Sequence, residues 1–134
     1  MDLQSLAYAL TQVAHNFGAV AVVGGAVCSG RPRTAPGRGI VRLILAGWLV
    51  QVVSGAGFGA ISFAYYGQFP DLHGIAVAAL SIKVACAVLG AVLAVAMLRG
   101  LRARPDRPQD AARVGQILLG VTALTAAAFL RWFS

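Results

Sequence analysis

Four long apolar stretches alternate with short polar segments along the chain. They cover roughly residues 3–29, 39–66, 73–98 and 111–133. Each stretch reaches the roughly 20 residues that a helix needs to cross about 30 Å of hydrocarbon. A transmembrane β-barrel would instead show alternating segments of about 10 residues separated by turns, which these continuous Ala, Val, Leu and Gly runs do not resemble. The pattern therefore predicts an all-α fold, an integral membrane four-helix bundle that forms a single domain over residues 1–134.

The composition agrees with a membrane protein and not with a soluble domain. Hydrophobic residues make up 59% of the 134 residues, charged residues make up only 11%, and the mean hydropathy is +0.79. Soluble domains carry about a quarter of their residues as charged side chains. We therefore expect no soluble domain beside the four spans.

The basic residues indicate how the helices are oriented. The first and third connecting regions hold nine arginines: Arg31, Arg33, Arg38, Arg42, Arg99, Arg102, Arg104, Arg107 and Arg113. The second connection, residues 65–74, has neither Lys nor Arg. Because short cytoplasmic loops are enriched in Lys and Arg, the first and third loops are predicted to be cytoplasmic. Both termini then face the outer, periplasmic side of a bacterial inner membrane that the chain crosses several times.

The net charge of +7 follows mainly from this topology. A basic protein with a pI near 10.8 is sometimes a nucleic-acid-binding protein. Here the arginines lie in two short loops beside membrane spans, so anionic lipid headgroups are the better partner. We expect contact with membrane lipid and no nucleic acid.

Polar side chains follow one face of the first apolar stretch. The spacing i, i+3, i+4, i+7 and i+8 relates Tyr8, Thr11, Gln12, His15 and Asn16. Residues at this spacing share one side of a helix, and such a side is costly to expose to lipid. This face is predicted to point into the bundle.

The third apolar stretch contains Lys83, the only lysine of the chain. If residues 3–29 and 73–98 both run from outside to inside, His15 lies about 18 Å and Lys83 about 15 Å below the outer end of its helix. The two side chains are then at a similar depth, near Gln51 of the second stretch. An ionisable side chain at this depth costs at least about 2.5 kcal/mol and by default marks a functional site. The alternative is that Lys83 only anchors a buried polar cluster through a backbone carbonyl and Gln51.

Two segments resemble the CopD and HemJ group of small membrane proteins. The segment "HNFGAVAVVGG", from His15 to Gly25, is similar to the first-helix pattern of that group, in which a histidine is followed after eight residues by a Gly-Gly pair. The segment "LSIKVACAVLGAVLAVAMLRGLRARP", which contains Lys83, resembles a later helix that carries a lysine and ends in basic residues. HemJ proteins are four-helix b-haem proteins that oxidise protoporphyrinogen, and CopD proteins are linked to copper handling.

The resemblance implies a haem-associated redox or haem-handling role in electron transport. It implies b-type haem as the cofactor, with His15 as the axial metal ligand and Lys83 on the other side of the haem as a ligand or propionate partner. Gln12, Asn16 and Gln51 would complete the cofactor-binding site. The catalytic residues stay unknown, and whether the chain is an enzyme stays open.

Two other classes of function remain open. The chain is also consistent with a non-catalytic accessory or structural subunit of a larger respiratory or photosynthetic membrane complex, in contact with other membrane-protein subunits, a second copy of itself or a quinone. The third alternative is a small transporter. A proton or ion path would need acidic groups within the membrane, and the chain has no glutamate and no aspartate in its apolar stretches.

Overall fold

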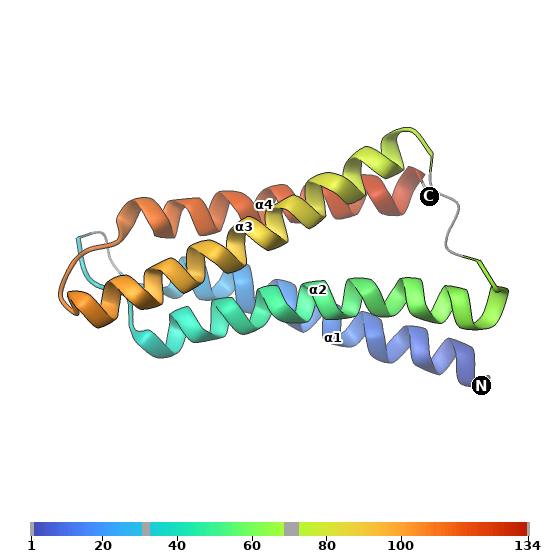
Figure 1. Cartoon of the computed structure of the whole chain (residues 1–134), viewed down its shortest axis with the longest axis horizontal. Coiled ribbons are helices and arrows are strands. Elements are labelled where there is room, and N and C mark those ends of the chain that lie inside the picture. Colours follow the sequence, from blue (N-terminus) through green and yellow to red (C-terminus); the bar gives the residue numbers. More distant parts are fainter. Residues whose placement is uncertain (1, 31–32, 69–72, 134) are drawn as a thin grey trace.

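The computed structural model describes residues 2–30, 33–68 and 73–133. These residues form four helices: α1 (Leu3–Cys28), α2 (Arg38–Tyr66), α3 (Ile75–Ala103) and α4 (Asp110–Phe133). The described part of the chain contains no β-strand. The predicted all-α, four-helix architecture is thus confirmed (Figure 1).

Each helix is long and apolar enough to span a membrane. Large apolar side chains are exposed on all four helices, for example Phe17, Val53, Val92 and Leu118, which are each at least 61% exposed. A soluble protein rarely leaves so much contiguous apolar surface in contact with water. The exterior therefore fits hydrocarbon, and the chain is a multi-pass membrane protein.

Helix α3 extends five residues beyond the end predicted at residue 98. The additional turn is held because the Leu101 side chain is buried and the Arg38 guanidinium donates a hydrogen bond to the Leu101 carbonyl at 3.1 Å. The helix ends at Ala103, one residue before Arg104, which precedes Pro105. A residue before proline disfavours the helical conformation, and this explains the boundary.

At the opposite end of the bundle, local hydrogen bonds cap the start of α1 and the end of α2. The backbone N–H of Ser5 donates to Asp2 Oδ1 at 2.6 Å, and this hydrogen bond holds the pKa of the Asp2 carboxyl below its ordinary value. Gly67 ends α2 in the left-handed conformation, with φ of 69°, and its N–H donates to the Phe63 carbonyl. Glycine adopts this conformation without the steric penalty of a side chain.

The four helices form two antiparallel hairpins, α1–α2 and α3–α4, which contact one another less than the helices within each hairpin do. Their ribbons lie close together at the end that holds the first and third loops and diverge toward the end that holds both termini (Figure 1). The buried core is concentrated toward the end that holds the first and third loops. It includes Val22, Ala26, Ile44, Trp48, Ala87 and Ala94. The hairpins are thus joined mainly at one end.

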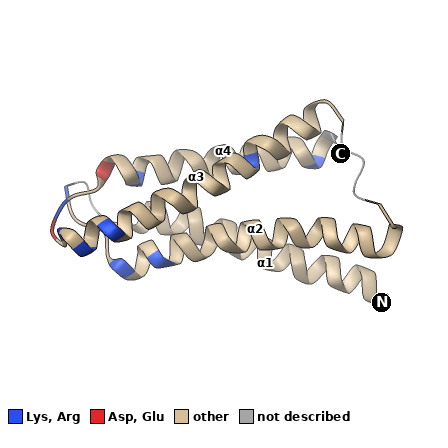
Figure 2. Ribbon diagram, in the orientation of Figure 1, with Lys and Arg blue, Asp and Glu red and all other residues tan. Residues whose placement is uncertain are grey.

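The positively charged residues are also concentrated at one end of the bundle. Figure 2 shows most of the basic residues gathered at the end with the first and third loops. Lys83 stands apart from them, about one third of the way along α3, and Arg131 lies in the last turn of α4. Both termini lie at the opposite end. This is the charge separation that underlies the predicted orientation with both termini outside.

Candidate functional site

His15 of α1 and Lys83 of α3 meet in the middle of the bundle. Lys83 Nζ lies 2.9 Å from His15 Nε2. His15 is buried, with 8% of its surface exposed, and Lys83 is half-buried. The structure therefore brings together the two ionisable side chains that the sequence placed at a similar depth.

Ser54 of α2 determines how the His15 ring is held. His15 Nδ1 lies 2.7 Å from Ser54 Oγ, and Ser54 Oγ donates to the Val50 carbonyl at 2.5 Å. A hydroxyl group has one hydrogen, so Ser54 must accept its second bond from His15 Nδ1–H. A neutral imidazole protonated at Nδ1 carries a lone pair at Nε2, and Lys83 donates to that lone pair. The hydrogen bonds thus run in one direction, from Lys83 through His15 and Ser54 to Val50.

Gln51 supports the same region through the backbone of α1. Its side-chain amide donates to the His15 carbonyl at 2.5 Å. The helices are close here because Gly18 has no side chain, and a Cβ at that position would lie 2.9 to 3.1 Å from atoms of Val50, Gln51 and Gly47. Gln51 therefore fixes α1 against α2 and touches the backbone of His15, not its ring.

Gln12 and Asn16 do not join the pair of ionisable residues. Gln12 Nε2 donates to Asn16 Oδ1 at 2.8 Å, and both side chains are exposed. At about 100° per residue, they lie about 60° and 100° around α1 from His15. This rotation is enough to take them off the surface that faces α2 and α3. The structure thus divides the predicted polar face into a buried part and an exposed part.

Phe58 of α2 forms an aromatic wall beside His15. Its ring meets the imidazole edge to face, with centroids 5.8 Å apart, and it stacks on Tyr8 with centroids 6.3 Å apart. Such aromatic contacts fix ring orientation in addition to burying apolar area. Ser54 and Phe58 were not among the predicted site residues. Their spacing from Gln51, at i+3 and i+7, is the signal that places them on the same side of α2.

A second buried polar cluster joins three helices closer to the arginine-rich end. Trp48 Nε1 donates to Gln116 Oε1 at 2.8 Å, and Gln116 Nε2 donates to the Gly90 carbonyl at 2.9 Å. The Gln116 side chain is completely buried. Trp48 lies directly against Gly90, where a Cβ would overlap the indole ring. The Trp48 and Gln116 polar atoms have partners within the protein, so the cluster holds α2, α3 and α4 together.

The chemistry of the donors restricts which metal centre the His15–Lys83 pair fits. The described residues contain no group of three or more His, Cys, Asp or Glu side chains that would hold a metal ion by themselves. Haem iron needs only axial ligands from the protein, and one or two nitrogen donors are sufficient. The pair matches this requirement in chemistry. Two nitrogen ligands on opposite sides of one metal ion lie about 4 Å apart, so the 2.9 Å contact must open by about 1 Å to admit it.

The chain shows no significant similarity to known proteins in the comparisons made. No protein-family model matches it, and neither a curated protein nor a solved structure gives a significant match. Its class therefore rests on its own structure. The fold and the site define a four-helix, multi-pass membrane protein with a histidine–lysine contact in the middle of its apolar spans.

Proposed function

We propose that the protein has a haem-associated redox or haem-handling role in the bacterial inner membrane. In this proposal His15 Nε2 is an axial ligand of a b-type haem, and Lys83 lies on the other side of the iron or pairs with a haem propionate. The observation that carries the proposal is the contact between His15 Nε2 and Lys83 Nζ, two nitrogen atoms from different helices at mid-span.

Among the residues that the structure describes, Lys83 has no acidic partner, and this supports a functional role. Of the described acidic residues, Asp2 and Asp106 lie outside the helices and Asp110 lies at the start of α4. A lysine within a membrane span costs at least about 2.5 kcal/mol and is normally compensated by a charged partner. A propionate carboxylate would compensate the ammonium charge, whereas a metal ion would bind the neutral amine.

The hydrogen bond from His15 to Ser54 supports the same role. Histidines that bind metals almost always donate their other ring N–H to a neighbouring acceptor, which fixes the tautomer and the ring orientation. Here Nδ1–H is directed at Ser54, so the lone pair of Nε2 points toward Lys83. This is the orientation that a metal-binding histidine requires.

The flexible stem of Lys83 would let its amine move away from His15. It has four rotatable bonds, and a shift of its end by about 1 Å does not require movement of the helix. To seat a haem macrocycle beside His15, the helices around the contact would also have to separate.

Absorption spectroscopy of the protein in mild detergent tests the proposal directly. We expect a reduced-minus-oxidised difference spectrum of b-type haem and nearly stoichiometric haem in the purified protein. The variant His15→Ala is expected to lose the haem, whereas His73→Ala, which changes the only other histidine of the sequence, should retain it. A colourless protein that added hemin does not reconstitute would overturn the proposal.

An accessory role in a larger membrane complex is the second candidate, and a groove on the surface favours it. Apolar and small side chains of α1 and α2 line a groove of about 650 Å³, and they include Phe17, Ala21, Gly24, Leu43 and Ala46. Small residues allow a helix of another subunit to approach closely in a membrane. A Cβ at Gly24 would contact nothing within 4 Å, so Gly24→Leu should fold normally and fill the groove. Loss of a higher-mass complex in this variant, in a protein without haem, would support the accessory role.

A further inference from the structure

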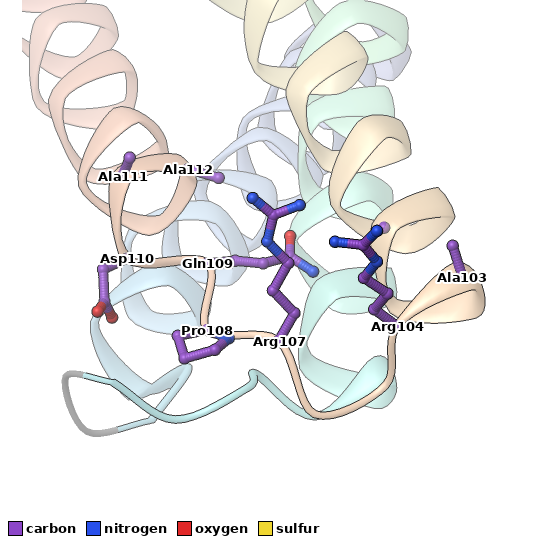
Figure 3. Close-up of a pocket in the computed structure, with 9 residues that line it drawn as sticks. Ala103, Arg104, Arg107, Pro108, Gln109, Asp110, Ala111 and Ala112 are labelled. Atoms are coloured by element: carbon purple, nitrogen blue, oxygen red, sulfur yellow. The ribbon is translucent and has the colours of Figure 1, made fainter.

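A pocket opens at the arginine-rich end of the bundle, between the end of α3 and the start of α4. Its volume is about 390 Å³, and Figure 3 shows the side chains that line it. This size lies within the usual range of small-ligand sites. The site is separate from the His15–Lys83 contact, because it is lined by the last turn of α3, the loop that follows and the first turn of α4.

Two guanidinium groups enter this pocket. Arg104 and Arg107 extend to the same side of the loop, with the Gln109 side chain between them (Figure 3). The backbone brings them together, because Arg107 N–H donates to the Arg104 carbonyl at 3.2 Å and closes a turn. Both side chains are exposed, and an anion between them would relieve the repulsion of their like charges.

No carboxylate of the described residues that line the pocket compensates these charges. Asp110 is at its edge, but its side chain is directed away from the two arginines (Figure 3). Both Asp110 carboxylate oxygens accept from the backbone N–H of Arg33, at 2.9 and 3.1 Å, and one lies 3.9 Å from the Arg113 guanidinium. Asp106 does not line the pocket. The inner surface of the pocket is therefore electropositive.

The start of α4 adds hydrogen-bond donors to the same space. Asp110, Ala111 and Ala112 form its first turn and line the pocket. The first N–H groups of a helix have no acceptor within that helix, and they lie at the positive end of its dipole. Gly100 forms part of the wall, where a Cβ would lie 3.3 Å from the Gln109 amide nitrogen. The Gln109 amide nitrogen donates to the Met97 carbonyl at 3.2 Å. Guanidinium and helix N–H groups are the donors that recognise phosphate.

We propose that this pocket binds a phosphate group, and that the headgroup of an anionic phospholipid supplies it. The pocket lies at the ends of two membrane spans, where lipid headgroups are found. Arg99 and Arg102 are exposed on the last turns of α3 and do not line the pocket. The proposal concerns a site apart from the haem site and does not depend on it.

Lipid binding to the full-length protein tests this proposal. Native mass spectrometry would count phosphatidylglycerol molecules retained by the protein, against phosphatidylcholine as the zwitterionic reference. We expect Arg104→Gln/Arg107→Gln to weaken retention about tenfold or more, because two charge-assisted contacts are lost. The matched control, Arg99→Gln/Arg102→Gln, removes the same charge at the same end but leaves the pocket unchanged, and it should retain the lipid.

Inorganic phosphate tests whether the bound phosphate group comes from a lipid headgroup or from free phosphate. If millimolar phosphate raises the melting temperature of the wild type but not of Arg104→Gln/Arg107→Gln, and phosphatidylglycerol does not, the pocket takes a soluble phosphate and the lipid part of the proposal is wrong. Retention of phosphatidylglycerol that phosphate does not displace supports the lipid. An equal loss of lipid in both double variants would show attraction to surface charge alone and would overturn the proposal.

Discussion

Lys83 Nζ donates a hydrogen bond to His15 Nε2 across 2.9 Å, although the two residues are 68 positions apart in the chain. Neither residue has a carboxylate of this protein as a neighbour within the spans, because the helices contain no acidic residue apart from Asp110 at the start of α4. The orientation of the pair is set by Ser54, which accepts the hydrogen bond from His15 Nδ1–H. This contact is the basis of the first two predictions.

The variant Ser54→Ala should weaken haem binding without removing it. His15 Nδ1–H would lose its acceptor, so the ring would no longer be held with Nε2 directed at Lys83. Loss of such an outer hydrogen bond typically lowers metal affinity about 10- to 100-fold. Titration of the haem-free protein with hemin measures this change. Ser62→Ala, which removes another buried hydroxyl of α2, is the control and should bind hemin as the wild type does.

The effects of substituting His15 and Lys83 on the free energy of unfolding should not be additive. In a double-mutant cycle of His15→Ala and Lys83→Ala, the interaction energy is expected at about 0.6 to 1.7 kcal/mol, the range found for hydrogen bonds between membrane helices. Unfolding by a denaturing detergent gives the free energies. A cycle that pairs Lys83→Ala with the remote Ser62→Ala should be additive. Additivity in both cycles would contradict a direct bond.

The variant Gly90→Ala should destabilise the bundle by about 1 to 3 kcal/mol, as is usual when a tightly packed core is overfilled. The new methyl group would overlap the Trp48 indole and displace it from Gln116. Gly55→Ala is the control, since a Cβ there meets nothing within 4 Å. Thermal unfolding gives the loss of stability, and Trp48 fluorescence in a Trp132→Phe background reports the displacement. An unchanged emission spectrum would show that the indole has not moved.

Acidification should weaken the hydrogen bond by which Asp2 caps the start of α1. The hydrogen bond from Ser5 lowers the pKa of Asp2 in the folded state below its ordinary value of 3.8. The stabilising contribution is therefore complete above the ordinary pKa and is lost as the pH falls through the lowered one. Faster hydrogen exchange of the Ser5 amide, corrected for the intrinsic effect of pH, measures this loss. In Asp2→Asn the cap is retained without an ionisable group, so the pH dependence should disappear.

Both termini are expected on the periplasmic side, because the arginine-rich loops lie at the opposite end of the bundle (Figure 2). A reporter that is active only in the periplasm should be active when fused after residue 134 and inactive when fused at residue 106. The reverse pattern would show that the arginine distribution does not set the orientation of this chain.

The sequence alone determined the secondary structure and the approximate depth of the two ionisable residues. Runs of apolar residues longer than a membrane thickness leave few alternatives to a helix, because every backbone N–H and C=O must be paired within the segment. The rise of 1.5 Å per residue then converts positions in the chain into depths, and this conversion is sufficient to place His15 and Lys83 at one level.

The contacts between helices were decided only by the tertiary structure. Depth does not specify rotation, so the sequence grouped Gln12 and Asn16 with His15, whereas packing leaves both exposed and paired with each other. The additional turn of α3 depends on Arg38 reaching the Leu101 carbonyl from another helix. The tautomer of His15 depends on a hydroxyl 39 positions away. Such contacts follow from how helical surfaces fit together, and the periodicity of one helix contains no information about the surface of its neighbour.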